Sequence, residues 1–231
     1  PEDMENEEEQ LRLCDFVTAP NAFVTQSLLD AGIAPKRILE TSYGWSLSRL
    51  QAAVAFDRPA RPPVFLFVGL GNVRKGLDLL LEAWERSGVQ GTLHLAGRID
   101  DELRARCARQ LARPDVKELG HISDMASVYA DADVFVFPSH EEGGPQVTYE
   151  AAGCGLPCIV SPMGAGRIIR HREEGFVIDP FDTNAWGDAM RSMADDVGRR
   201  HQLGLAAAQR AQYFTWDKVG ARLYELFVTR V

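Results

Sequence analysis

Residues 64–84, VFLFVGLGNVRKGLDLLLEAW, decide the fold class of this chain. The stretch opens with five consecutive apolar residues at 64–68 and then passes through a segment that contains three glycines. Leucines and a tryptophan follow at steps of three and four residues, which is the spacing of a helix with one buried face. This order predicts a buried strand, a glycine-rich loop and a helix.

The same unit recurs along the chain. Apolar runs at 92–96, 134–137 and 158–160 are followed by stretches of helical character at 101–111, 145–153 and 166–171, and a short strand is expected at 176–178. Strands without polar alternation, each followed by a helix, indicate a parallel sheet covered on both faces. The sequence thus predicts an α/β fold, a doubly wound Rossmann-like domain. Beyond residue 183 only two or three terminal helices are expected, the last from Asp217 onward.

The ends of the chain differ from its middle. The first eleven residues carry six carboxylates and almost no apolar side chains, and the start without an initiator Met suggests a piece of a longer protein. A segment rich in Pro and Arg, DRPARPP, separates this part from the rest. We expect an acidic lead-in and the tail end of a truncated N-terminal domain at 1–56, a linker at 57–63, the Rossmann-like domain at 64–200, and C-terminal helices packing outside the sheet at 201–231.

The composition of the chain excludes some classes of binding partner and some cellular locations. The net charge is −8, and no run of five or more Lys and Arg occurs, which argues against nucleic acid as the main partner. No apolar stretch reaches the ~18 residues of a membrane span, and the acidic start is unlike a signal peptide. We therefore expect a soluble, cytoplasmic protein. The four scattered cysteines are expected to be reduced, buried thiols.

Two loops are expected to carry the chemistry, because ligands of doubly wound sheets bind beyond the carboxyl ends of the strands. The first loop, 69–76, places Arg74 and Lys75 at the start of a helix. Cations there oppose the helix macrodipole by ~0.3–1 kcal/mol each, unless an anion lies between them. A phosphate would bond to backbone N–H groups and both side chains. Alternatively, the glycines only form a tight turn and both cations point to water.

The second loop, 140–150, contains two glycines before Pro145, which suits the first turn of a helix. Its carboxylates, Glu142 and Glu150, are separated by seven residues. Carboxylates at that separation can hold hydroxyls on two parts of one ligand, such as a sugar and a ribose, while the helix N-terminus binds phosphates between them. Alternatively, Glu142 only interacts with the helix N-terminus and Glu150 is a solvated surface residue.

With both loops in view, the chain resembles the retaining glycosyltransferases of family 4, also called group 1, and specifically the C-terminal, donor-binding half of their GT-B fold. The resemblance covers roughly residues 64–230, and the Glu142-x7-Glu150 pair is the signature of that family. It rests on the 64–84 stretch, LGHISD (119–124), ADADVFVFPSHEEGGPQVTYEAAGCGLPCIV (130–160), GAGRIIRHREEGFVIDPFDTNAW (164–186) and FTW (214–216). Residues 11–45 resemble the last portion of the family's N-terminal domain.

The resemblance implies roles for individual residues. Lys75, with Arg74 beside it, would bind the donor diphosphate, Glu142 the hydroxyls of the transferred sugar, and Glu150 the ribose. Lys75, Arg74 and Glu142 are thus the candidate catalytic residues. The remaining donor-binding candidates are Gly69 and Gly71 of the first loop, Gly143, Gly144, Pro145, Gln146 and Val147 for the phosphates and sugar, His121 and Ile122 for the base, and Gly97 and Arg98 as a wall of the nucleotide pocket.

The resemblance also implies an activity, which is transfer of a hexosyl group from a nucleotide diphosphate sugar with retention. In the sequence we identify no Asp-x-Asp motif or His cluster suited to a metal ion, and we expect no cofactor and no metal. A glycan, lipid or small-molecule acceptor would bind mainly on the missing N-terminal domain, so the fragment alone is expected to be inactive. The full-length protein would have the option of peripheral membrane association.

Two departures from the family pattern prevent the identity of the sugar donor from being inferred from the resemblance. Many relatives have Arg where this chain has Leu70, and an aromatic residue followed by Gly where it has Gly144 and Pro145. The alternatives are a sugar-nucleotide epimerase or glycan phosphorylase of the same architecture, and a non-catalytic nucleotide-binding domain. A dehydrogenase is disfavoured, because the first turn lacks Gly-x-Gly-x-x-Gly with an acidic residue about 20 positions later.

Overall fold

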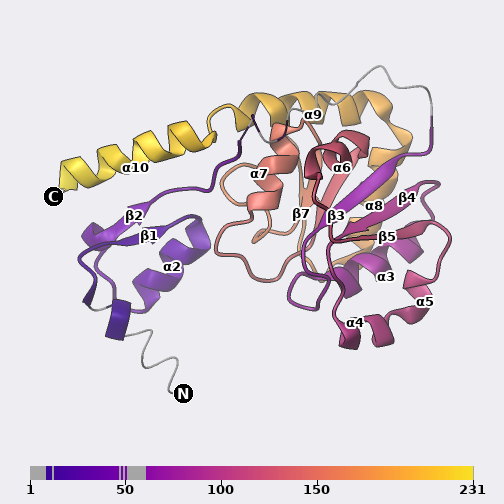
Figure 1. Ribbon diagram of the computed structural model, residues 1–231, viewed down its shortest axis with the longest axis horizontal. Coiled ribbons are helices and arrows are strands. Elements are labelled where there is room, and N and C mark those ends of the chain that lie inside the picture. Colours follow the sequence, from indigo (N-terminus) through magenta and orange to yellow (C-terminus); the bar gives the residue numbers. More distant parts are fainter. Residues whose placement is uncertain (1–8, 12, 47, 49, 51–60, 231) are drawn as a thin grey trace.

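The computed structural model describes residues 9–11, 13–46, 48, 50 and 61–230 (Figure 1). Most of the expected acidic lead-in and residues 57–60 of the expected linker lie outside the described residues.

A six-stranded parallel sheet forms the centre of the fold, which confirms the predicted α/β, doubly wound architecture. The strands are β3 Val64–Val68, β4 Thr92–Ala96, β5 Val116–Gly120, β6 Val134–Phe137, β7 Cys158–Val160 and β8 Gly175–Val177. Their order in the sheet is β5-β4-β3-β6-β7-β8. The chain therefore builds outward from β3 in one direction and then returns to β6 and builds outward in the other. Ligands of such sheets bind where the order reverses, which here is between β3 and β6.

Helices lie on both sides of this sheet (Figure 1). They are α3 Leu77–Ser87, α4 Asp101–Arg106, α5 Ala108–Leu111, α6 Met125–Asp131, α7 Gln146–Gly153, α8 Thr183–Asp195 and α9 Val197–Ala211. In α3, the residues at steps of three and four, Leu77, Leu80, Leu81 and Trp84, are all buried, as their spacing predicts. Burial of side chains of this size contributes about 1.5–3 kcal/mol each, so α3 is fixed on the sheet mainly by this face.

Some elements differ from the sequence prediction. The helix expected at 101–111 is interrupted at Cys107. The segment expected to be helical at 166–171 is instead a turn at 166–168, followed by irregular backbone and a single β-bridge at His171. Gly166 has φ +57°, a left-handed backbone that ends any helix there. Strand β8 begins one residue earlier than expected. Strand β5 and helix α6 were not predicted.

The N-terminal part forms a separate two-stranded parallel sheet of β1 Val17–Ala19 and β2 Ile38–Glu40, with α2 Ala22–Asp30 and the short 3-10 helix Pro35–Arg37 between them. The last helix, α10 Trp216–Arg230, leaves the large sheet and lies beside this part (Figure 1). Its Arg230 donates to the carbonyls of Lys36 and Ile38, at 3.3 and 3.2 Å. The boundary expected between residues 200 and 201 falls inside α9.

Trp45 joins the N-terminal part to the C-terminal helices. It is 1% exposed, and its indole N–H donates to the carbonyl of Ala211 at 2.8 Å. Its backbone N–H donates to the Phe214 carbonyl at 3.0 Å, and its carbonyl accepts from the Trp216 N–H at 3.1 Å. A Cβ on Gly153 would lie 2.3 Å from the Trp45 ring, so only glycine fits at the end of α7. Side-chain, backbone and packing contacts thus all fix this segment.

Three of the four cysteines, at 107, 154 and 158, are buried free thiols as predicted. Burial raises the pKa of the Cys154 thiol to about 12. Cys14 is exposed, so the prediction of a buried thiol is wrong for this residue, which lies next to the small N-terminal sheet. Among the helices of the described residues, none has the length and apolar character that crossing a membrane requires.

Candidate functional site

The two predicted loops meet at the point where the strand order reverses. Loop 69–76 follows β3. The second predicted segment, 140–150, follows β6 and continues into α7, and β3 and β6 are neighbours in the sheet. The His140 N–H donates to the Arg74 carbonyl at 2.9 Å. Gly76 has φ +69°, and a Cβ there would lie 2.2 Å from the Pro138 carbonyl oxygen. The loops therefore pack backbone against backbone, and Gly76 is required for that contact.

Lys75 and Glu142, one from each loop, form an ion pair through Nζ and Oε1. Their side chains are only 15% and 9% exposed. The Lys75 ammonium also lies 5.7 Å from the centre of the Phe137 ring. The structure thus places together the cation and the carboxylate that were assigned to neighbouring parts of one ligand, and the alternative that Lys75 points to water is wrong.

Arg74 behaves differently from Lys75. Its side chain is exposed, and within the described part of the chain its guanidinium makes no hydrogen bond or ion pair. Only its carbonyl is engaged, by the His140 N–H and by the Ser139 hydroxyl at 3.4 Å. The Arg74 guanidinium is therefore accessible to an anion that binds at the first loop.

The glycines of the first loop hold the loops together. Gly69 donates its N–H to the Ala96 carbonyl at 2.9 Å, and Gly71 donates to the Arg98 carbonyl at 2.8 Å. A Cβ on Gly97 would lie 2.0 Å from the Gly69 carbonyl oxygen. Two of the N–H groups expected to meet a phosphate are thus used inside the protein. Arg98 itself has a side chain that is 83% exposed.

Asn21, at the start of α2, holds the second loop, and sequence reasoning missed it. Its side chain is 2% exposed, and its amide donates to the carbonyls of Glu142 at 3.0 Å and Gly143 at 2.9 Å. Its amide oxygen accepts the N–H of Val24 at 2.9 Å and caps α2. One side chain therefore joins the N-terminal part to the backbone that carries Glu142. An Asn before a helix predicts a cap, but nothing local reveals the second contact.

Tyr43 packs against the next residue of the same loop. A Cβ on Gly144 would lie 2.0 Å from Cδ2 of the Tyr43 ring, so any side chain at position 144 would displace this ring. The ring also lies 6.0 Å from that of Trp216. Gly144 thus has a packing role where a ligand-binding role was expected.

Helix α7 begins after Pro145, which occupies the N-cap position with φ −78°, close to the value that the proline ring favours. The Gln146 N–H donates to the Gly144 carbonyl at 2.9 Å, and the Thr148 N–H donates to the Pro145 carbonyl at 2.9 Å. The Gln146 N–H is therefore engaged. Val147 is half-buried and packs against the core.

Glu150 is held one turn into α7. It accepts hydrogen bonds from the hydroxyl of Tyr129 at 3.0 Å and the side-chain amide of Gln146 at 2.9 Å. Burial, followed by the charge of Glu150, raises the pKa of Tyr129 well above its ordinary value, which keeps this hydroxyl a donor. The alternative that Glu150 is a solvated surface residue is wrong, because its carboxylate is fixed by two neighbours.

The residues that were expected to contact the base of the nucleotide lie after β5. His121 is exposed, and Ile122 is half-buried against the core. The Gly97 N–H donates to the carbonyl of Gly120 at 2.8 Å, so the loops after β4 and β5 are adjacent. His140 lies against Phe181, with 4.8 Å between the ring centres. The predicted residues therefore gather along one edge of the sheet, beyond the carboxyl ends of its strands.

No group of three or more His, Cys, Asp or Glu suited to a metal ion occurs among the described residues. The expectation that the sequence has no Asp-x-Asp motif is wrong, because Asp131 and Asp133 form one. Asp131 ends α6 and Asp133 directly precedes β6, so the motif lies at the opposite end of the sheet from the loops. Asp133 accepts the Val64 N–H at 2.8 Å and pairs with Arg61 at 3.0 Å. This motif has a structural role.

Comparison with known proteins identifies the family of the chain. The chain matches the family described as Glycosyl transferases group 1 over residues 62–196. It is 34% identical to the D-inositol 3-phosphate glycosyltransferase of Pseudarthrobacter chlorophenolicus, over 92% of this chain and 48% of the relative. It is 28% identical to the enzyme of that name from Thermobispora bispora, over 96% of this chain and 57% of the relative. The chain thus spans about half the length of these relatives.

Solved structures share the fold. Sucrose-phosphate synthase from Thermosynechococcus elongatus has a TM-score of 0.82 and 25% identity, covering 96% of this chain and 60% of that one. Anabaena Alr3699/HepE in complex with UDP and glucose has a TM-score of 0.82 and 19% identity, covering 96% and 67%. The fold matches GT-B glycosyltransferase structures, as the resemblance implies. The family match includes both loops and the whole Glu142-x7-Glu150 pair, and the chain therefore belongs to the glycosyl transferases group 1 family.

Proposed function

We propose that this chain is the C-terminal, donor-binding domain of a retaining family 4 glycosyltransferase and binds a nucleotide diphosphate sugar between loop 69–76 and segment 142–150. The observation that carries this proposal is the contact of Lys75 with Glu142 at the reversal of strand order. A cation and a carboxylate side by side suit a ligand that offers a diphosphate and, next to it, sugar hydroxyls.

The proposed chemistry is charge stabilisation. As the bond from the anomeric carbon to the diphosphate breaks, negative charge develops on the leaving group, and cations fixed beside it bind the transition state more strongly than the ground state. Lys75 and the accessible Arg74 would supply these cations. Glu142 would accept hydroxyls of the transferred hexose, and Glu150 those of the ribose. No general base and no metal ion is required from these residues.

The remaining parts of the proposal concern the whole protein. We propose that the acceptor, a glycan, lipid or small molecule, binds mainly on a second domain, so that the 231-residue chain binds donor without transferring it. Fixing the acceptor and excluding water would require that opposing wall. We also place the protein in the cytoplasm, with the option of peripheral membrane association. The four unpaired cysteines support a reducing compartment.

Calorimetric titration of the chain with UDP, GDP, ADP and their sugars tests the donor site. UDP is the first probe, since the HepE structure of the same fold holds it. One nucleotide should bind at a single site, and Lys75→Met should weaken it roughly ten- to a hundredfold, as expected for loss of a charge-assisted contact. Arg86→Gln is the control, because Arg86 lies in the last turn of α3, away from both loops, and its side chain is 57% exposed. Equal affinity of wild type and Lys75→Met would contradict the assignment.

Product analysis of the full-length protein separates the alternatives. A transferase forms a glycosylated acceptor with retained configuration from a labelled donor. An epimerase would return the donor with altered sugar stereochemistry, and a phosphorylase would require phosphate. Nucleotide binding without turnover would indicate a non-catalytic domain.

A further inference from the structure

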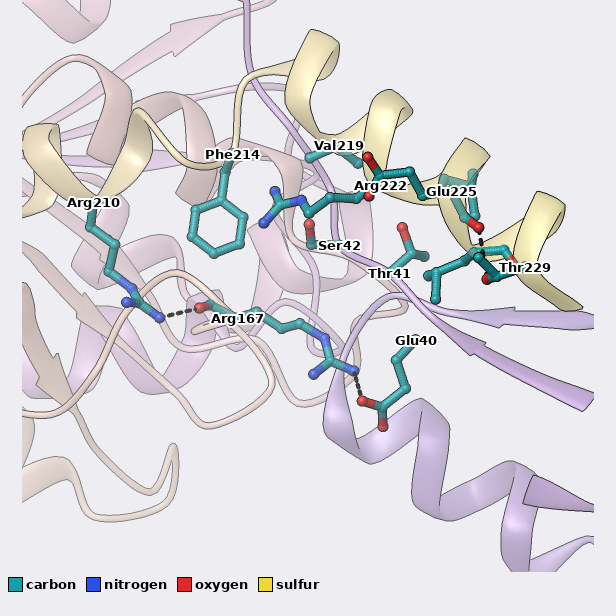
Figure 2. A pocket seen from close by; sticks show the side chains of 12 residues that line it. Glu40, Thr41, Ser42, Arg167, Arg210, Phe214, Val219, Arg222, Glu225 and Thr229 are labelled. Carbon is teal, nitrogen blue, oxygen red and sulfur yellow. Dashed lines mark hydrogen bonds and ion pairs between the residues drawn. The ribbon is translucent and has the colours of Figure 1, made fainter. Parts of the chain in front are cut away.

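A cavity of about 810 Å³ lies between the segment that follows β2, the turn that contains Arg167, and helices α9 and α10 (Figure 2). Its size falls within the ~300–1,000 Å³ of ordinary small-molecule sites. Three arginines line it, Arg167, Arg210 and Arg222, together with the ring of Phe214. The cavity is therefore formed by segments far apart in the sequence, and its lining holds three guanidinium groups and two carboxylates, those of Glu40 and Glu225.

Two of the arginines are fixed on one ring. The guanidinium carbons of Arg210 and Arg222 lie 5.6 and 5.5 Å from the centre of the Phe214 ring. Arg210 donates to the carbonyls of Ile168 at 2.6 Å and Arg167 at 2.8 Å. Nε of Arg210 also lies 3.8 Å from Oε1 of the buried Glu174, so part of its charge is already balanced. Arg222 donates to the carbonyls of Lys218, at 3.3 Å, and Tyr213, and carbonyl partners orient a guanidinium without neutralising its charge. Arg222 is thus held in place for an anion.

The guanidinium of the third arginine has two donors without a hydrogen-bond acceptor in the described part of the chain. These donors, Nε and Nη2 of Arg167, are buried. The nearest anion is the carboxylate of Glu40, whose Oε2 lies 3.6 Å from Nη2, too far for a hydrogen bond. The Glu40 side chain is 57% exposed, and its Oε1 accepts from the Thr25 hydroxyl at 3.1 Å. Glu40 therefore has an alternative partner and is free to leave Arg167.

We propose that this cavity binds a small hydroxylated phosphate monoester, whose phosphate takes the place of the Glu40 carboxylate beside Arg167. A phosphate offers several acceptor oxygens to guanidinium groups in a bidentate arrangement, which a carboxylate at 3.6 Å does not achieve. The hydroxyls of Thr41 and Ser42 and the carboxylate of Glu225 also line the cavity and suit the hydroxyl groups of the ligand.

The cavity adjoins the donor loops without sharing side chains with them. Arg167 follows Gly166, where a Cβ would lie 3.2 Å from the ring of Pro145. On the other wall, Ser42 precedes Tyr43, which packs on Gly144. The proposed site is thus separate from Lys75 and independent of the proposed function.

Titration calorimetry of the 231-residue chain with glycerol 3-phosphate, and separately with inorganic phosphate, tests the proposal. Glycerol 3-phosphate should bind saturably and more tightly than phosphate. Arg167→Gln should weaken it roughly ten- to a hundredfold. Glu40→Gln should tighten it several-fold, because the competing carboxylate is removed. Lys75→Met and Arg98→Gln should leave it unchanged.

Three results would overturn the proposal. The first is that glycerol 3-phosphate shows no saturable binding. The second is that Lys75→Met abolishes its binding while Arg167→Gln retains it. The third is that inorganic phosphate and glycerol 3-phosphate bind with equal affinity. Circular dichroism checks that Arg167→Gln folds. If it does not, Arg222→Gln on the exposed face of α10 replaces it and should weaken binding in the same direction.

Discussion

Asn21 provides the sharpest test of how the donor loop is held, because one side chain performs two separable tasks. Its amide oxygen caps α2, while its amide nitrogen donates to the carbonyls of Glu142 and Gly143 at 3.0 and 2.9 Å. Asn21→Ser keeps a capping hydroxyl but removes both donated bonds. At about 0.5–1.5 kcal/mol net for each bond, the free energy of unfolding should fall by about 1–3 kcal/mol. Asn21→Ala should cost about 1 kcal/mol more, through the lost cap.

Urea unfolding measures these differences, and an unchanged slope shows that the variant unfolds from the same compact state. Gln26→Ser is the matched control, since Gln26 lies in the same helix and its exposed amide donates only to Asp30, at 2.8 Å. It should change stability by less than about 0.5 kcal/mol. Asn21→Ser should also weaken donor binding, as the backbone that carries Glu142 loses its support. If Asn21→Ser is as stable as Gln26→Ser, the loop is held by other contacts and the reasoning fails.

Three further predictions follow from charge and burial. Glu142→Gln should tighten UDP binding to this chain, because the carboxylate beside Lys75 repels the negatively charged diphosphate even while the pair stays intact, and weaker binding in calorimetry would contradict this. In native protein at pH 8 only Cys14 should react rapidly with a thiol reagent, and the three buried thiols only after denaturation; a second fast equivalent would show that one is accessible. The two hydrogen bonds from Arg113, 2.9 and 2.8 Å long, hold the pKa of Asp115 below its ordinary value. The stability that this lowered pKa provides is present above the unfolded pKa of about 3.9 and is lost as pH falls through the folded pKa. In urea unfolding, Asp115→Asn should therefore lower the free energy of unfolding at pH 7, and lower it much less once the pH is below the folded pKa.

The strands at the centre of the sheet could be predicted from the sequence, but the edge strand β5 could not. Strands β3 and β6 are buried along their whole length, so each appears in the sequence as a continuous apolar run. Strand β5 lies at an edge of the sheet, and its Lys117 and Glu118 are exposed, which removes that pattern. Helix α6 has seven residues, too few for a helical period to be recognised.

The sequence predicted which loops form the site, because the position of the loops after β3 and β6 follows directly from the strand order. It did not predict the contacts that these loops make inside the protein. Free N–H groups were expected at the glycines, yet Gly69 and Gly71 use theirs to bind neighbouring loops. The contact of Asn21 with Glu142 joins residues 121 positions apart, and a single sequence carries no signal for such a pair.

The pairing of Lys75 with Glu142 bears on how an empty donor site remains stable. With side chains 15% and 9% exposed, either charge left alone would be poorly hydrated, and each therefore satisfies the other. An ammonium carries three N–H donors, so Lys75 can bind a phosphate oxygen while it keeps Glu142. The second oxygen of Glu142 stays available for a sugar hydroxyl. Donor binding in this arrangement adds partners to an existing pair instead of separating it, and the cost of leaving a buried charge unpaired does not arise. The same pair that stabilises the empty site would then set the distance between the diphosphate and the hydroxyls of the transferred sugar.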